Sequence, residues 1–112
     1  MTKIESSTKP IKILRSLTPK ETGTLLRKIP GWRLSQNKTI YRELNMKNFL
    51  AAVDLIKRIA KIAESQNHHP DIHLTDYRKL RIELTTHDAN GVSELDFIQA
   101  AKINQLPVKL KN

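Results

Sequence analysis

The 112-residue sequence contains no cysteine, which excludes disulfide bonds, a thiolate nucleophile and a cysteine-ligated zinc site. Long apolar runs are also absent, because the longest, Phe49 to Val53, is far below the roughly 20 residues of a membrane-spanning helix. No apolar segment follows the basic N-terminus, as a secretory signal would require. These absences favour a cytoplasmic protein without a membrane partner, and the length of 112 residues predicts a single small domain.

Aromatic residues are few, and the positive charge is unevenly spread. The net charge is +9, but residues 1–33 carry eight basic and two acidic side chains, whereas residues 64–99 carry three basic and seven acidic ones. The five aromatic residues occur singly, without the basic and aromatic interleaving of a single-strand nucleic-acid binder. We therefore interpret the charge as a solvated basic surface and do not expect a nucleic-acid partner.

Helix and strand signals alternate along the chain. Thr18-Pro19-Lys20-Glu21 predicts a capped helix start, and three- and four-residue spacing of apolar side chains predicts a long helix. Polar and apolar residues alternate in the predicted strands. The expected elements are a helix over 19–28, strands over 32–34 and 39–44, a helix from about Met46 to Ser65 with Phe49 on its apolar stripe, strands around 72–74 and 80–84, and a helix capped by Ser93. The order α-β-β-α-β-β-α predicts an α+β fold.

The composition also predicts the limits of the domain. Residues 1–16 form a basic, flexible leader in the prediction, with a short edge strand at Ile11–Leu14. Residues 17–106 form the single domain, in which Ser35–Lys38 are the loop of a hairpin. Pro107 is expected to end the ordered part, which leaves residues 107–112 as a tail.

All four histidines lie within twenty residues, at positions 68, 69, 73 and 87. The spacing His69-x3-His73 is that of metal ligands on a helix, but Pro70 interrupts any helix there. Adjacent histidines can also simply cap a helix C-terminus. The third interpretation is general acid–base catalysis on a small polar substrate, since histidine exchanges protons near neutral pH.

The pattern Glu64-x3-His68-His69-Pro70-x6-Tyr77-x9-His87-x8-Asp96 resembles the signature of the pterin-4a-carbinolamine dehydratases. The resemblance extends from about Leu17 to Gln105 and includes Gly31-Trp32 and Glu83–Asp88. The chain departs from animal members at Asn67 and Ile72, where those proteins tend to have aspartate and tryptophan.

The resemblance implies a lyase that converts a 4a-hydroxytetrahydropterin to a quinonoid dihydropterin and water, in the recycling of the cofactor of aromatic amino acid hydroxylases. It implies no metal and no bound cofactor. His68, His69 and His87 would be the acid–base set, and Glu64, Asn67, Pro70 and Asp96 would contact the pterin or orient the imidazoles. Trp32 and Tyr77 are expected to be packing residues, and His73 is expected to be exposed and outside the site.

The family resemblance also implies a four-stranded antiparallel sheet with helices packed on one face, assembled into a homodimer or homotetramer. Some relatives act instead as binding modules that stabilise transcription-factor dimers or assist assembly of a carboxylase. Relatives of the assembly type tend to lose histidines of the motif. Because His68, His69 and His87 are all present here, catalysis is the favoured interpretation and the binding module is the alternative.

Overall fold

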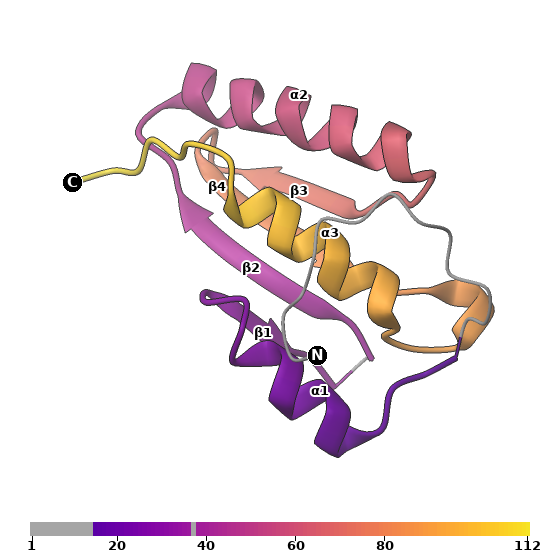
Figure 1. Cartoon of the computed structure of the whole chain (residues 1–112). Helices are drawn as coiled ribbons and strands as arrows, with labels where there is room; N and C mark the ends of the chain where they lie inside the picture. Colours follow the sequence, from indigo (N-terminus) through magenta and orange to yellow (C-terminus); the bar gives the residue numbers. More distant parts are fainter. Residues whose placement is uncertain (1–14, 37) are drawn as a thin grey trace.

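The computed structural model describes residues 15–36 and 38–112, which form one antiparallel sheet covered by helices (Figure 1). The strand order is β1-β2-β4-β3, and every pair of neighbours is antiparallel. The elements in chain order are α1 (Pro19–Leu26), β1 (Trp32–Leu34), β2 (Ile40–Asn45), α2 (Phe49–Gln66), β3 (Asp71–Thr75), β4 (Lys79–Leu84), the one-turn 3₁₀ helix η1 (His87–Ala89) and α3 (Glu94–Asn104). The α+β class and the predicted element order are confirmed, with η1 as an addition.

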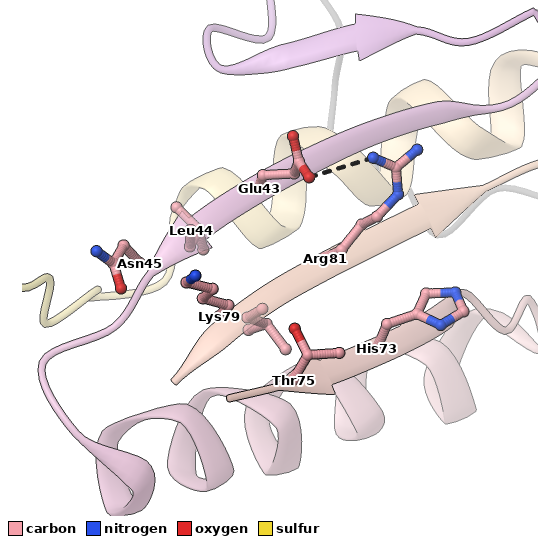
Figure 2. Close-up of a pocket in the computed structure, with 8 residues that line it drawn as sticks. Glu43, Leu44, Asn45, His73, Thr75, Lys79 and Arg81 are labelled. Carbon is pink, nitrogen blue, oxygen red and sulfur yellow. Dashed lines mark ion pairs between the residues drawn. The ribbon is translucent and has the colours of Figure 1, made fainter. Parts of the chain in front are cut away.

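The two faces of the sheet differ in chemistry because side chains alternate along each strand. On β4, Leu80, Ile82 and Leu84 are buried under the helices, where they join one core with Phe97 of α3. The opposite face is open and polar. Figure 2 views this open face, with side chains such as Glu43, Arg81 and His73 standing on it. The helices therefore cover one face, as the resemblance implied.

Helix α2 begins later than the sequence predicted. The side chain of Asn48 accepts a hydrogen bond from the Ala51 N–H at 2.8 Å and caps the helix, whereas Asn45 is the last residue of β2. The ladder with β4 runs to Asn45, and the Met46 N–H donates to the Arg78 carbonyl at 2.9 Å, which keeps the chain extended through the predicted helix start at Met46. Phe49 lies in the first turn with 52% of its surface exposed, so its predicted place on the buried stripe is wrong.

The buried positions of α2 are Ala52, Leu55, Ile59 and Ala63, which recur at three- and four-residue steps as the spacing of apolar side chains predicted. The other two helices begin as predicted, because Thr18 with Glu21 and Ser93 with Asp96 both form reciprocal capping boxes. The second box matters for the site, since Asp96 belongs to it.

The C-terminal segment is attached to the sheet. The Lys47 N–H donates to the Lys109 carbonyl and the Lys111 N–H to the Asn45 carbonyl, each at 2.9 Å. The prediction that order ends at Pro107 is therefore wrong, because free backbone groups at the end of β2 pair with this segment. The edge strand predicted at Ile11–Leu14 lies outside the described residues.

None of the helices within residues 15–36 and 38–112 combines the length and the apolar character needed to cross a membrane.

Candidate active site

The turn after α2 carries three of the predicted site residues. Asn67 ends the helix in the left-handed conformation (φ 50°), which asparagine tolerates better than most residues. The His68 N–H still donates to the Ala63 carbonyl at 3.1 Å, so this histidine is fixed against the last helical turn. His69 and the half-buried Pro70 then lead directly into β3.

The side chain of Gln99 in α3 forms hydrogen bonds to this turn. Its side chain is fully buried, and its Nε2 donates to the His68 carbonyl at 2.6 Å and to Gln66 Oε1 at 3.0 Å. Its Oε1 is buried without a hydrogen-bond partner in the described structure. The turn that presents the adjacent histidines is thus tied to α3 as well as to α2.

His68 and Asp96 form the buried pair of the site. Nε2 of His68 lies 2.6 Å from Oδ1 of Asp96, and the two side chains are 11% and 0% exposed. The second carboxylate oxygen, Oδ2, accepts the Ser93 N–H at 2.9 Å and the Thr86 hydroxyl at 2.8 Å. Both oxygens of Asp96 are therefore occupied by protein donors, and its charge lies at the N-terminus of α3, where it is stabilised.

His69 and Glu64 form a second histidine–carboxylate pair at 2.5 Å, but on the surface. The His69 and Glu64 side chains are 56% and 76% exposed, so solvent screens the interaction and the pair adds little to stability. Exposure leaves both groups accessible to a ligand. The two adjacent histidines thus face different environments, one enclosed and one open.

His87 begins η1, one residue after the Thr86 that binds Asp96. Its side chain is exposed, and within residues 15–36 and 38–112 it has neither a hydrogen bond nor an ion pair. The Ala89 N–H donates to the Thr86 carbonyl at 3.0 Å, and Asn90 closes the turn in the left-handed conformation. The loop is therefore shaped by backbone bonds, which leave the His87 imidazole uncommitted.

Of the predicted binding residues, Glu64 is paired to His69, Asp96 is enclosed, and Asn67 and Pro70 shape the turn. The sequence did not single out the link from Thr86 and Ser93 to Asp96, or the role of Gln99. The capping-box pattern placed Asp96 next to Ser93, but nothing in the local sequence joins Asp96 to His68, 28 residues away.

Trp32 is a packing residue, as predicted, since it is 5% exposed and its Nε1 donates to Asn104 at 2.9 Å. Tyr77 is not, because it occupies the β3–β4 turn (φ 54°) and is 54% exposed.

His73 lies apart from the other histidines, on the open sheet face and exposed, as predicted (Figure 2). It borders a shallow hollow of about 430 Å³ whose lining contains none of the motif residues. Beside it, Arg81 donates to Glu83 at 2.5 Å, and this hydrogen bond is the main reason that the pKa of Glu83 lies below its usual value. No group of three or more histidine, cysteine or acidic side chains in the described structure could hold a metal ion.

Comparison with known proteins identifies relatives of this arrangement. The family model for pterin 4 alpha carbinolamine dehydratase matches residues 15–106. The chain is 42% identical over 101 residues to pterin-4-alpha-carbinolamine dehydratase 2, mitochondrial, of Arabidopsis thaliana, covering 88% of this chain and 54% of that protein. It is 40% identical over 90 residues to a protein from Picosynechococcus named as a putative pterin-4-alpha-carbinolamine dehydratase, covering 80% of this chain and 96% of that protein.

A solved structure from Brucella melitensis, described as a transcriptional coactivator/pterin dehydratase, superposes with a TM-score of 0.76 at 34% identity, covering 80% of this chain and 96% of that one. The matched residues 15–106 contain all the helices and strands of the described structure and both histidine–carboxylate pairs. The chain therefore belongs to the pterin-4-alpha-carbinolamine dehydratase family.

Proposed function

We propose that this chain is a hydro-lyase that removes water from a 4a-hydroxytetrahydropterin and releases a quinonoid dihydropterin. The observation that carries the proposal is the pair of His68 with the fully buried Asp96, next to an accessible His69. A histidine oriented by a buried carboxylate is suited to proton transfer, and an exposed neighbour places a second proton-transfer group on the same turn. Family membership supports the choice of substrate.

The reaction requires one acid and one base. The leaving hydroxyl group must gain a proton to depart as water, and the neighbouring ring nitrogen must lose one. His68, His69 and His87 are the proposed set, and each positioned proton transfer typically contributes about 10²–10⁴ in rate. The balance of atoms needs no redox step and no covalent intermediate.

The carboxylates take different roles in this proposal. Asp96 orients His68, because both of its oxygens already have protein donors. Glu64 is exposed and binds the amino–amide edge of the pterin, with which a carboxylate can form two parallel hydrogen bonds. Asn67 and Pro70 set the backbone of the turn against which the ring lies.

The wider role follows from the same assignment. We place the chain in the recycling of the pterin cofactor of aromatic amino acid hydroxylases, acting as a homodimer or homotetramer without a bound cofactor. A cytoplasmic location remains the expectation from the sequence, although the Arabidopsis relative is named as mitochondrial.

A non-catalytic binding module is the alternative. The description of the Brucella structure pairs a coactivator with a dehydratase, so the same fold is associated with both activities. The three histidines favour catalysis, since a binding module has no need for a carboxylate-oriented imidazole.

Turnover measurements decide between the two. The full chain is mixed with freshly generated 4a-hydroxytetrahydropterin, and the appearance of quinonoid dihydropterin is followed by absorbance against the uncatalysed rate. We expect acceleration proportional to protein concentration. A rate equal to the uncatalysed one, from protein with a cooperative thermal transition, would favour the binding module.

A further inference from the structure

Thr86 contacts both the His68–Asp96 pair and the loop that carries His87, and it has no role in the mechanism proposed above. It is 4% exposed, and its hydroxyl lies 2.8 Å from Oδ2 of Asp96 and 2.7 Å from the hydroxyl of Ser93, which is 1% exposed. The same residue precedes His87, and its backbone is bonded to Gly91 across the loop. Thr86 is thus connected by its side chain to the His68 pair and by its main chain to the His87 turn.

The direction of these hydrogen bonds follows from the number of protons available. A threonine hydroxyl has one proton, and an ionised carboxylate can only accept. The Thr86 proton therefore goes to Asp96, and the proton between the two hydroxyl groups comes from Ser93. The result is a chain of donors that runs from Ser93 through Thr86 to Asp96, in which each bond polarises the next.

The Asp96 carboxylate determines which nitrogen of His68 carries the proton, and the two donors on Oδ2 hold the carboxylate in its orientation. Oδ2 of Asp96 is occupied by Thr86 and by the Ser93 N–H, so Oδ1 is left to accept from Nε2 of His68. In the neutral imidazole the proton is then on Nε2 and the lone pair on Nδ1. Nδ1 of His68 has no hydrogen-bond partner in the described structure. It is not one of the fully buried polar atoms that lack a partner there, so part of its surface is accessible.

We propose that Thr86 is a positioning residue that, through Asp96, fixes His68 as the Nε2–H tautomer and so directs its proton exchange with substrate to Nδ1. The part of this inference that concerns substrate rests on the proposed dehydratase function, whereas the part that concerns the tautomer of His68 does not depend on it. Removal of the Thr86 hydroxyl takes away one of the two donors that hold Oδ2 of Asp96, so the carboxylate can turn and His68 can adopt the other tautomer, whose lone pair points toward Asp96 and away from the accessible side.

The test compares Thr86→Val, which keeps the shape and loses the hydroxyl, with Thr86→Ser, which keeps the hydroxyl. Thr85→Val is the matched control, because the Thr85 hydroxyl donates to the Lys38 carbonyl at 2.9 Å and lies outside the donor chain. Two measurements are made on each full-length protein. One is kcat and KM for carbinolamine dehydration, and the other is the His68 tautomer from ¹⁵N-histidine NMR, with His68→Gln assigning the signal.

We expect an Nε2–H tautomer for His68 in the wild type, in Thr86→Ser and in Thr85→Val. Thr86→Val should show a mixture of tautomers and a kcat lower by about 10- to 100-fold at a nearly unchanged KM, the range typical when a group that orients a metal-bound histidine is removed. A purely structural role would lower the melting temperature without moving the tautomer signal.

An Nδ1–H tautomer of His68 in the wild type overturns the proposal by itself. The proposal can therefore be tested even if the Thr86→Val protein fails to fold. Wild-type tautomer and kcat in Thr86→Val would also overturn it. Absence of turnover in the wild type would instead overturn the dehydratase assignment, and the NMR comparison would still decide whether Thr86 sets the tautomer.

Discussion

Nε2 of His68 and Oδ1 of Asp96 lie 2.6 Å apart, although 28 residues separate them in the chain. The contact joins the turn after α2 to the first turn of α3, and it encloses a carboxylate that is 0% exposed. Because Asp96 also completes the cap of α3, one side chain contributes both to the fold and to the proposed proton transfer. Variants of this pair should therefore change stability and activity together, whereas variants of exposed site residues should change activity alone.

Replacement of Asp96 by Asn should separate orientation from packing. The amide keeps the volume, but it cannot accept at both positions, so His68 loses its fixed tautomer and one donor loses its partner. We expect kcat to fall by roughly 10²–10⁴-fold, the contribution typical of general acid–base groups. The free energy of unfolding should fall by about 1–3 kcal/mol, the usual cost of leaving a buried donor unsatisfied. Turnover and urea titration check the two effects, and a fully active Asp96→Asn would contradict the role of this carboxylate.

Stability should fall in acid in a way that depends on Glu83. Its folded-state pKa lies below the unfolded value, mainly because Arg81 donates to it, so its contribution is complete above the unfolded pKa. That contribution is lost as pH falls from about 4.5, the ordinary glutamate range, through the folded pKa. Glu83→Gln should therefore show a smaller loss of urea midpoint between pH 7 and pH 3.5 than the wild type. Asp54→Asn, an exposed change on α2, is the control, and equal acid sensitivity of wild type and Glu83→Gln would contradict the prediction.

The N-terminal segment should be dispensable for activity up to Arg15. Arg15 pairs with Glu21 at 2.8 Å and is the main reason that the pKa of Glu21 falls to about 2, while Ser16 donates to the Ala89 carbonyl. A protein that begins at Arg15 should keep both the wild-type rate and the wild-type melting temperature. A protein that begins at Leu17 should keep the rate and melt slightly earlier. Loss of turnover in the protein that begins at Arg15 would show that residues 1–14 contribute to the site.

Removal of metal should leave turnover unchanged. Dehydration needs proton transfers only, and three histidines can supply them. The check is the rate before and after exhaustive dialysis against a chelator, together with elemental analysis of the protein. A stoichiometric metal whose removal abolishes the rate, and whose return restores it, would contradict the assignment of acid–base roles to the histidines.

The sequence predicted the fold where local rules determine it. The Thr18–Glu21 and Ser93–Asp96 boxes and the alternation over residues 80–84 each act over a few residues, and the structure confirms them. The start of α2 was misplaced because the pairing of Asn45 with Lys79, and of the backbone around Met46 with the chain end, is a tertiary effect. The exposure of Phe49 has the same cause, since it lies in the first turn beyond the end of the sheet.

The motif supplied the candidate residues of the site, but not their connections. The spacing of the motif identified Glu64, the histidines and Asp96, yet which carboxylate faces which imidazole depends on how α3 lies against the turn after α2. The donor chain through Thr86 and the clamp from Gln99 involve residue types that are common in any sequence. Only the folded arrangement distinguishes them.

The most direct measurement is the dehydration rate of four variants, His68→Ala, His69→Ala, His87→Ala and His73→Ala, with their melting temperatures. The account predicts losses of roughly 10- to 10⁴-fold for the first three, without additivity when they are combined, and a normal rate for His73→Ala. His68→Ala alone should also melt earlier, because it leaves the buried Oδ1 of Asp96 without a hydrogen-bond partner. Normal turnover by the folded fraction of all three motif variants, or an equal loss in His73→Ala, would contradict histidine acid–base catalysis in this protein.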